Sequence, residues 1–139
     1  MLTRKYRILL VDDDRSLLRL LSMRLLAAGY AVSAVESAEQ ALAELTTLMP
    51  HLIITDLRMG GMDGMALFDR VHRDHPALPV FVLTAHGSET EASAAVKRGV
   101  SSYMTKPFDS KILLDQVARA LDAGDHAVRS GIPAEARSM

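Results

Sequence analysis

Residues 7–14 read RILLVDDD, in which four apolar side chains in a row are followed by three aspartates. A continuous apolar run of this kind, without alternating polar residues, indicates a strand that is buried on both faces. Such strands occur in parallel sheets that helices cover on both sides. We therefore expect Arg7–Asp12 to be an inner strand of an α/β domain, with acidic side chains at its carboxyl end.

The same alternation of short apolar runs and longer amphipathic stretches continues along the chain. Four further strands are predicted, at Ala31–Val35, His51–Asp56, Leu78–Thr84 and Val100–Thr105. Helices are predicted at Asp14–Ala28, from Ser37 to just before Pro50, and at Gly64–Arg73, Ser88–Arg98 and Asp109–Asp122. Strands that alternate with helices imply right-handed crossovers onto one parallel sheet. The predicted fold class is α/β: a flavodoxin-like, doubly wound five-stranded parallel sheet, order 2-1-3-4-5, with five helices.

The starts of the predicted helices carry capping residues. The capping-box spacing occurs at Ser37 with Gln40 and at Ser88 with Glu91. The other expected caps are aspartates, namely Asp14, Asp63 and Asp109.

Length and composition restrict the possible classes of protein. The chain has 139 residues, 49% of them hydrophobic, no cysteine and a net charge of −1. The lack of cysteine excludes disulfides, thiolate metal sites and cysteine nucleophiles, and agrees with a cytoplasmic location. No apolar run approaches the ~20 residues of a membrane span, and the charge gives no argument for direct nucleic-acid binding. We expect one domain, residues 5–122, and a linker or disordered tail at residues 123–139, where apolar periodicity is lost.

Polar residues end or directly follow the expected strands, at the edge where a doubly wound sheet carries its function. They are Asp12, Asp13, Asp56, Thr84 and Lys106. Crowded carboxylates repel one another, and a hard cation such as Mg²⁺ (or Mn²⁺), which takes oxygen ligands, relieves that repulsion. With the cation and Lys106 present, the site favours a further anion, and a phosphoryl group fits. Asp56 would then be the nucleophile that forms an acyl phosphate.

Taken singly, each of these residues has an ordinary structural explanation. Consecutive aspartates after a strand often form a turn and a helix cap, and Asp56 can cap the loop that follows it. Thr84 is a good strand former, and Lys106-Pro107 can be a simple turn. Their joint position at the carboxyl ends of separate strands is what favours a functional site.

The chain resembles the receiver domains of bacterial two-component response regulators over roughly residues 5–122. The segments that carry the resemblance are ILLVDDD (8–14), IITDLRM (53–59), MDG (62–64), VLTAHG (82–87) and SYMTKPF (102–108). They also look like the receivers of sigma-54-dependent, nitrogen-regulator-type transcriptional regulators. One departure is Gly60, followed by Gly61, where the family commonly has proline; this loop should be looser.

The resemblance implies a role for each matching residue. Asp56 corresponds to the phosphoacceptor, and Asp12 and Asp13 to the acidic pair, with Asp13 the more direct Mg²⁺ ligand. The other implied roles are a metal-binding backbone carbonyl at Arg58, a switch hydroxyl at Thr84, a switch aromatic at Tyr103, a phosphate-binding lysine at Lys106, and tuners of the hydrolysis rate at Arg58 and His86. A cis Lys106–Pro107 bond is implied as well. Asp14 matches no essential position, so we assign it to helix capping.

The resemblance also implies partners. A sensor histidine kinase would donate the phosphoryl group, and the chain would act as a signalling switch and not as an enzyme with an external substrate. Homodimerisation is expected through the face formed by Ser88–Asp122. ATPase and DNA-binding output domains would lie elsewhere, since the sequence contains no GxxxxGK[ST] phosphate-binding loop. No membrane partner is expected.

Two other functions are compatible with part of the sequence. Asp12 and Asp14 form a DxD after a strand, as in Mg²⁺-dependent phosphatases of the haloacid-dehalogenase type, but that function leaves Asp56 without a role. A degenerate receiver that only binds other proteins is the second alternative, and the intact acids, Thr84 and Lys106 argue against it. The strands exclude a histidine phosphotransfer domain.

Overall fold

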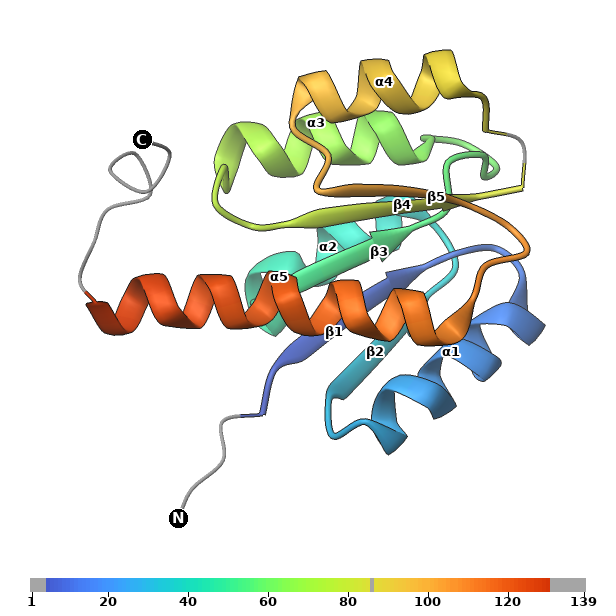
Figure 1. Ribbon diagram of the computed structural model, residues 1–139. Helices are drawn as coiled ribbons and strands as arrows, with labels where there is room; N and C mark the ends of the chain where they lie inside the picture. The colour runs from blue at the N-terminus through green and yellow to red at the C-terminus, as the bar shows by residue number, and fades with distance from the viewer. Residues whose placement is uncertain (1–4, 86, 131–139) are drawn as a thin grey trace.

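Five parallel strands form one sheet in the order β2-β1-β3-β4-β5, as the sequence predicts (Figure 1). The computed structural model describes residues 5–85 and 87–130. The strands are β1 (Arg7–Val11), β2 (Ala31–Val35), β3 (Leu52–Thr55), β4 (Val80–Thr84) and β5 (Ser102–Thr105). The helices are α1 (Arg15–Ala27), α2 (Ala38–Leu48), α3 (Gly64–Asp74), α4 (Glu89–Arg98) and α5 (Ser110–Ser130).

The register of the sheet brings the ends of its inner strands level. Val11 at the end of β1 pairs with Val35 of β2 and with Thr55 of β3. Thr84 at the end of β4 pairs with Thr105 of β5. Residues that directly follow these positions therefore meet at one edge of the sheet.

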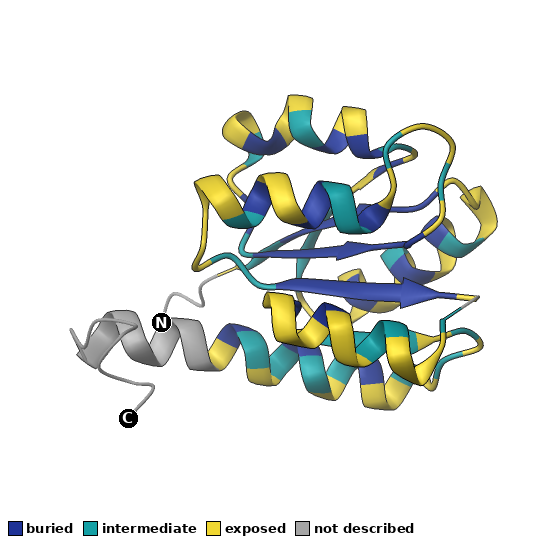
Figure 2. Cartoon of the chain, turned by 90° about the horizontal axis from the view of Figure 1, so that it is seen from above, coloured by how far each residue is buried: buried dark blue, intermediate teal, exposed yellow. Residues whose placement is uncertain are grey.

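Two apolar layers enclose the sheet, one on each face (Figure 2). Leu9 and Val11 point into the layer shared with α2, α3 and α4, whereas Ile8 and Leu10 point into the layer shared with α1 and α5. These four side chains are at most 1% exposed. Each such burial stabilises the fold by about 2 kcal/mol relative to an exposed side chain, so the four apolar residues in a row define β1 as an inner strand.

The predicted helix caps are present. The side chains of Asp14, Ser37, Asp63 and Ser88 each accept a hydrogen bond from the backbone N–H three residues further on. Asp109 accepts from the N–H groups of Lys111 and Ile112. The capping box at Ser37 differs in one contact, because the Gln40 side chain accepts from the N–H of Glu36, one residue before the cap.

Helix α5 extends further than the sequence pattern predicts. It runs to Ser130, eight residues beyond the expected end at Asp122, so the first part of the expected tail is helical. Loss of apolar periodicity does not end a helix, because propagation costs little once a helix has nucleated. The rest of the expected tail, residues 131–139, lies outside the described residues. Among the helices that the structure describes, this long one included, none has the length and apolar character needed to cross a membrane.

Gly64 is required where α3 begins against the end of β3. A Cβ atom at this position would lie 2.2 Å from the carbonyl oxygen of Asp56 and 3.0 Å from the Cα of Leu57. The Gly64 N–H also donates to the Leu57 carbonyl at 2.8 Å. The backbone that carries Asp56 is therefore in direct contact with the start of α3.

We predict that Gly64→Ala destabilises the domain by about 2–3 kcal/mol, because the backbone must shift to relieve the clash. Gly60→Ala is the matched control, since a Cβ there meets no atom within 4 Å. Its effect should stay within about 0.5 kcal/mol. Urea denaturation followed by circular dichroism measures both, and equal stabilities of the two variants would contradict the close contact.

Candidate functional site

Three carboxylates gather at the carboxyl edge of the sheet. Asp12, Asp13 and Asp56 each offer an oxygen atom, and these oxygens lie within 4.8 Å of one another. Asp12 and Asp56 are buried, and Asp13 is exposed. This separation allows the three side chains to share one cation, so the predicted convergence of distant aspartates is confirmed.

Backbone hydrogen bonds fix the two buried carboxylates. The N–H of Asp12 donates to the Val35 carbonyl at 3.2 Å, and the N–H of Asp56 donates to the Val11 carbonyl at 2.8 Å. These bonds extend the parallel ladders by one residue beyond the strands. Oδ1 of Asp12 accepts from the N–H of Asp14 at 2.9 Å, and Oδ1 of Asp56 accepts from the N–H of Leu57 at 2.9 Å. The orientation of each carboxylate therefore follows from the fold itself.

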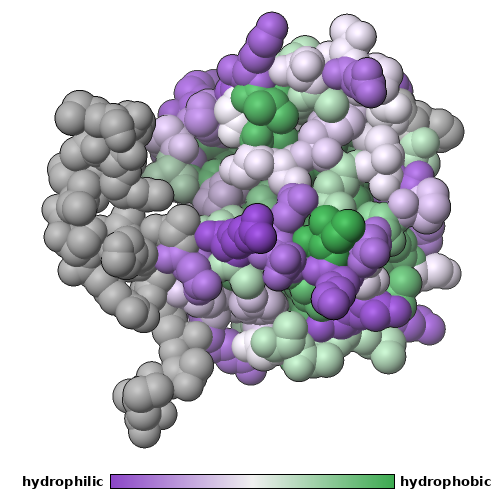
Figure 3. Space-filling model, in the orientation of Figure 1, coloured by the Kyte–Doolittle hydropathy of each residue, from purple (hydrophilic) through white to green (hydrophobic). Residues whose placement is uncertain are grey.

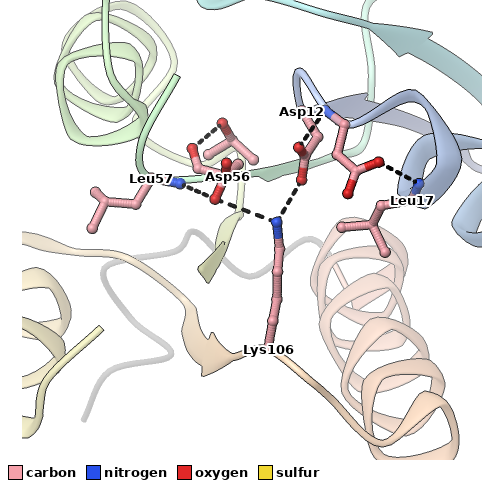
Figure 4. A network of polar contacts seen from close by, with 7 residues as sticks. Asp12, Leu17, Asp56, Leu57 and Lys106 are labelled. Atoms are coloured by element: carbon pink, nitrogen blue, oxygen red, sulfur yellow. Dashed lines mark hydrogen bonds and ion pairs between the residues drawn. The ribbon is translucent and has the colours of Figure 1, made fainter. Parts of the chain in front are cut away.

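Lys106 reaches the carboxylates from the loop after β5. Its Nζ lies 2.8 Å from Oδ2 of Asp12 and 3.5 Å from Oδ1 of Asp56 (Figure 4). The side chain is 18% exposed, so solvent screens these contacts only in part. The N–H of Lys106 donates to the Thr84 carbonyl at 2.7 Å, and the Lys106–Pro107 bond is cis, as the family resemblance implies.

The electrostatics of the site show excess negative charge. Burial raises the pKa of the Asp56 carboxyl, and repulsion from Asp12 raises it further, while Lys106 opposes the shift only in part. Burial alone would lower the pKa of the Lys106 ammonium, but its contacts with Asp12 and Asp56 outweigh burial and raise it. One ammonium against three carboxylates leaves the site undersupplied with positive charge. A hard divalent cation with oxygen ligands is the group that this donor set fits.

Thr84 and Tyr103 meet beside this cluster, at Gly87. A Cβ atom on Gly87 would lie 2.8 Å from both Cε1 and Oη of Tyr103 and 2.9 Å from Cγ2 of Thr84. Thr84 is fully buried, and the Tyr103 hydroxyl is buried with no hydrogen-bond partner among the residues that the structure describes. Burial raises the pKa of Tyr103, and the nearby Glu91 carboxylate adds to that shift. The sequence did not single out Gly87, whose missing side chain leaves room for the tyrosine ring.

Arg58 forms an ion pair that the sequence did not indicate. Its guanidinium lies 3.2 Å from the Glu91 carboxylate of α4, and both side chains are about half exposed. An exposed pair of this kind stabilises a fold by less than about 1 kcal/mol. It nonetheless connects the loop after Asp56 to α4. His86, the other expected rate-tuning residue, lies outside the described residues.

The fold and the site define an α/β domain with an acidic cluster suited to a divalent cation, and comparisons with known proteins identify its family. Residues 8–118 match the family described as response regulator receiver domain, and the chain belongs to that family.

Several relatives are transcriptional regulators. The chain is 46% identical to the transcriptional regulatory protein GlrR of Escherichia coli (strain K12) over 115 residues, which are 83% of this chain and 26% of that protein. It is 39% identical to the DNA-binding transcriptional regulator NtrC of Klebsiella pneumoniae over 112 residues, 81% of this chain and 24% of that protein. The chain thus spans about a quarter of the length of these relatives.

A solved structure supports the same assignment. The crystal structure of NtrX from Brucella abortus in complex with ADP superposes with a TM-score of 0.84 at 30% sequence identity. The match covers 92% of this chain and 30% of that chain. The fold and the family therefore agree, and the chain is a receiver domain of the type found in NtrC-like regulators.

The raised pKa of Asp56 leads to a prediction about stability. The folded chain binds this proton more tightly than the unfolded chain, so stability falls as pH rises from the ordinary carboxyl pKa through the raised pKa of Asp56. The cost of holding Asp56 ionised is present wherever the pH lies above that raised pKa. We predict that Asp56→Asn raises the Tm of the metal-free chain at pH 7 by about 2–4 °C, a shift corresponding to about 1 kcal/mol or less.

Calorimetry in EDTA measures this difference, with Asp14→Asn as the control. Asn retains the capping function at the exposed Asp14 position, so the control should melt like the unchanged chain. A lower Tm for Asp56→Asn would mean that Asp56 stabilises the metal-free fold, contrary to this account.

Proposed function

We propose that the chain is a phosphoryl-accepting switch in which Asp56 takes a phosphoryl group from a sensor histidine kinase. The observation that carries the proposal is the cluster of Asp12, Asp13 and Asp56 with Lys106 at its edge. Buried acids that remain short of positive charge favour binding of a cation together with an anion. A phosphoryl group coordinated by a divalent cation supplies both the negative and the positive charge.

The transfer step follows from the position of Asp56. Both Lys106 and the Leu57 N–H contact Oδ1 of Asp56, so Oδ2 carries neither contact and is the better nucleophile. An oxygen of Asp56 attacks the phosphorus of a phosphohistidine, and the O–P bond forms as the P–N bond breaks. The electron pair of the broken bond leaves with the imidazole nitrogen. Hydrolysis by water later returns Asp56 and inorganic phosphate.

Asp12, Asp13 and Asp56, with the backbone carbonyl of Arg58, are the residues proposed to hold Mg²⁺ or Mn²⁺. When bound, the ion neutralises charge on the phosphoryl oxygens. Lys106 would pair with another phosphoryl oxygen. To do so, it would give up part of its contact with the carboxylates. The residues present fit this role by charge, by ligand type and by their separation of no more than 4.8 Å.

The conformational response is proposed to pass through Thr84 and Tyr103. The Thr84 hydroxyl would move toward the phosphoryl group, and Tyr103 would adjust in the space that they share at Gly87. This change biases the surface of α4, β5 and α5 toward a second conformation. Arg58 and His86, at the rim, would adjust the rate of hydrolysis.

The partners proposed for the whole protein come from its relatives. GlrR and NtrC are named as transcriptional regulators, and the chain matches about a quarter of each. We propose that the chain controls ATPase and DNA-binding output domains in a cytoplasmic regulator and does not itself contact nucleic acid. The net charge of −1 gives no basis for such a contact.

A phosphatase of the haloacid-dehalogenase type is less consistent with the geometry. That function requires Asp12 and Asp14 to act together on a substrate. The Asp14 side chain instead accepts the N–H of Leu17 and caps α1, and Asp56 takes part in the acidic cluster. The family match and the geometry both favour the phosphoacceptor.

We predict that acetyl phosphate with Mg²⁺ labels Asp56 and that Asp56→Asn abolishes the label. Intact-mass spectrometry detects the added phosphoryl group, and peptide mapping locates it. Asp14→Asn is the matched control and should be labelled like the unchanged chain, because Asp14 only caps α1. Undiminished labelling of Asp56→Asn would place the acceptor elsewhere.

Homodimerisation through the 88–122 face is part of the proposal. Figure 3 shows that the side of the molecule bearing α4, β5 and α5 is mostly polar, with apolar side chains in small separate patches. Val96 on α4 is 54% exposed and is one of the larger apolar side chains at the surface. A mixed surface of this kind suits reversible association more than a permanent dimer.

We predict that beryllofluoride with Mg²⁺, which mimics a phosphoryl group, shifts the chain toward a dimer and that Val96→Glu weakens this dimer at least tenfold, about 1.4 kcal/mol. Sedimentation velocity measures the association constant. Leu20→Glu is the control, since Leu20 is 44% exposed on α1, across the sheet from α4. Equal weakening by both variants would contradict the proposed face.

A further inference from the structure

The loop between β3 and α3 contains Gly60 and Gly61 and yet has defined anchors. At its base, the Gly64 N–H donates to the Leu57 carbonyl at 2.8 Å. At its far side, the Met62 N–H donates to Oε2 of Glu39 at 3.1 Å. Arg58 lies between these two anchors, immediately after Asp56 and Leu57.

Glu39 comes from a different part of the fold. It stands in the first turn of α2, 23 residues before Met62 in the sequence. The hydrogen bond from Met62 lowers the pKa of the Glu39 carboxyl, so the residue is ionised at neutral pH and accepts as a charged group. Hydrogen bonds to charged acceptors are stronger than neutral ones.

Gly61 allows the carboxylate to approach the loop. Its φ is +80°, a left-handed conformation that favours glycine, and a Cβ there would lie 2.8 Å from Oε2 of Glu39. Met59 and Met62 pack against the apolar layer under α2 and α3. The loop is thus held by apolar side chains on its inner side and by Glu39 at its backbone.

We propose that Glu39 is a positioning residue for the phosphoryl-accepting site, because it fixes the glycine-containing loop that carries Arg58. A loop with two adjacent glycines loses more backbone entropy on ordering than one with proline at the first position. Glu39 orders the loop before any ligand arrives, so the cation binds without that cost. The inference rests on the proposed function, since the Arg58 carbonyl is taken there as a cation ligand.

Glu39 has a second, purely local effect that must be separated from this one. An acid in the first turn stabilises its own helix through the helix dipole. Loss of that effect would change the stability of α2 and leave the loop and the cation affinity unchanged. The experiment therefore needs a readout at Met62 and one at the cation site.

The test compares Glu39→Ala and Glu39→Gln with Glu44→Ala, which removes another exposed glutamate of α2. Calorimetric titration with MgCl₂ gives the Mg²⁺ affinity, and amide hydrogen exchange by NMR reports on Met62. Glu39→Ala should weaken Mg²⁺ binding about threefold to tenfold, the effect of one lost hydrogen bond, and accelerate Met62 exchange. Glu39→Gln keeps an acceptor oxygen, so its Mg²⁺ affinity should fall less than that of Glu39→Ala. Glu44→Ala should have the Mg²⁺ affinity and the Met62 exchange rate of the unchanged chain.

The glycines supply an independent arm. Gly61→Ala should weaken Mg²⁺ binding at least as much as Glu39→Ala does, because its methyl group displaces the carboxylate and its φ of +80° strains the loop, while Gly60→Ala should not weaken it. If Glu39→Ala does not fold, Glu39→Gln, which causes no backbone strain, tests the same contact: weaker Mg²⁺ binding with faster Met62 exchange supports the positioning role, and unchanged Mg²⁺ binding overturns it.

The outcomes separate the inference from the proposed function. Unchanged Mg²⁺ affinity in Glu39→Ala and Gly61→Ala, with Asp56 still labelled by acetyl phosphate, overturns the positioning role and leaves the phosphoacceptor intact. A lowered Tm with unchanged Mg²⁺ affinity also overturns it and assigns Glu39 to helix stability. An unchanged chain that neither binds Mg²⁺ nor takes the label overturns the proposed function itself.

Discussion

The contact between Lys106 and two buried carboxylates is the interaction on which the site depends. Its ammonium lies 2.8 Å from Asp12 and 3.5 Å from Asp56, and these acids are held close by the ends of neighbouring strands. Without the Lys106 ammonium between them, the two buried carboxylates would repel each other and strongly destabilise the fold. Lys106 relieves only part of the repulsion, as the raised pKa of Asp56 records. The site therefore keeps an excess of negative charge, which a bound cation would reduce.

The fold places these charges without relying on flexible side chains. The N–H groups of Asp12 and Asp56 continue the hydrogen bonding of the sheet, and Gly64 brings the start of α3 against the Asp56 carbonyl. The aspartates have short side chains whose orientation is set by neighbouring N–H groups. Only Lys106 must extend a long side chain, and it is largely buried as it does so. Rigid elements thus supply the precision that the proposed phosphoryl transfer would require.

The sequence predicts the fold and the acidic cluster because both follow from one rule, that parallel strands end at the same edge of a sheet. Two features of the sequence are sufficient to apply this rule. They are the apolar run at Ile8–Val11 and the polar residues at the end of each strand. Contacts made by long side chains do not follow from that rule. Glu91 has the spacing of a cap residue, and its ion pair with Arg58 is visible only in three dimensions. Glu39 resembles any first-turn acid, and no local pattern distinguishes its contact with Met62.

Tyr103 shows how such contacts connect the site to the surface. Leaving a buried hydroxyl without a partner costs about 1–3 kcal/mol, and the Tyr103 hydroxyl has none among the described residues. Packing of the Tyr103 ring beside Thr84 and Gly87 must offset that cost. Glu91 and Arg58, whose charges act on the Tyr103 hydroxyl, lie on α4 and on the loop after Asp56. For the switch proposed above, a small free-energy difference between two positions of the Tyr103 ring would allow a modest change at Thr84 to alter the populations on the α4 side.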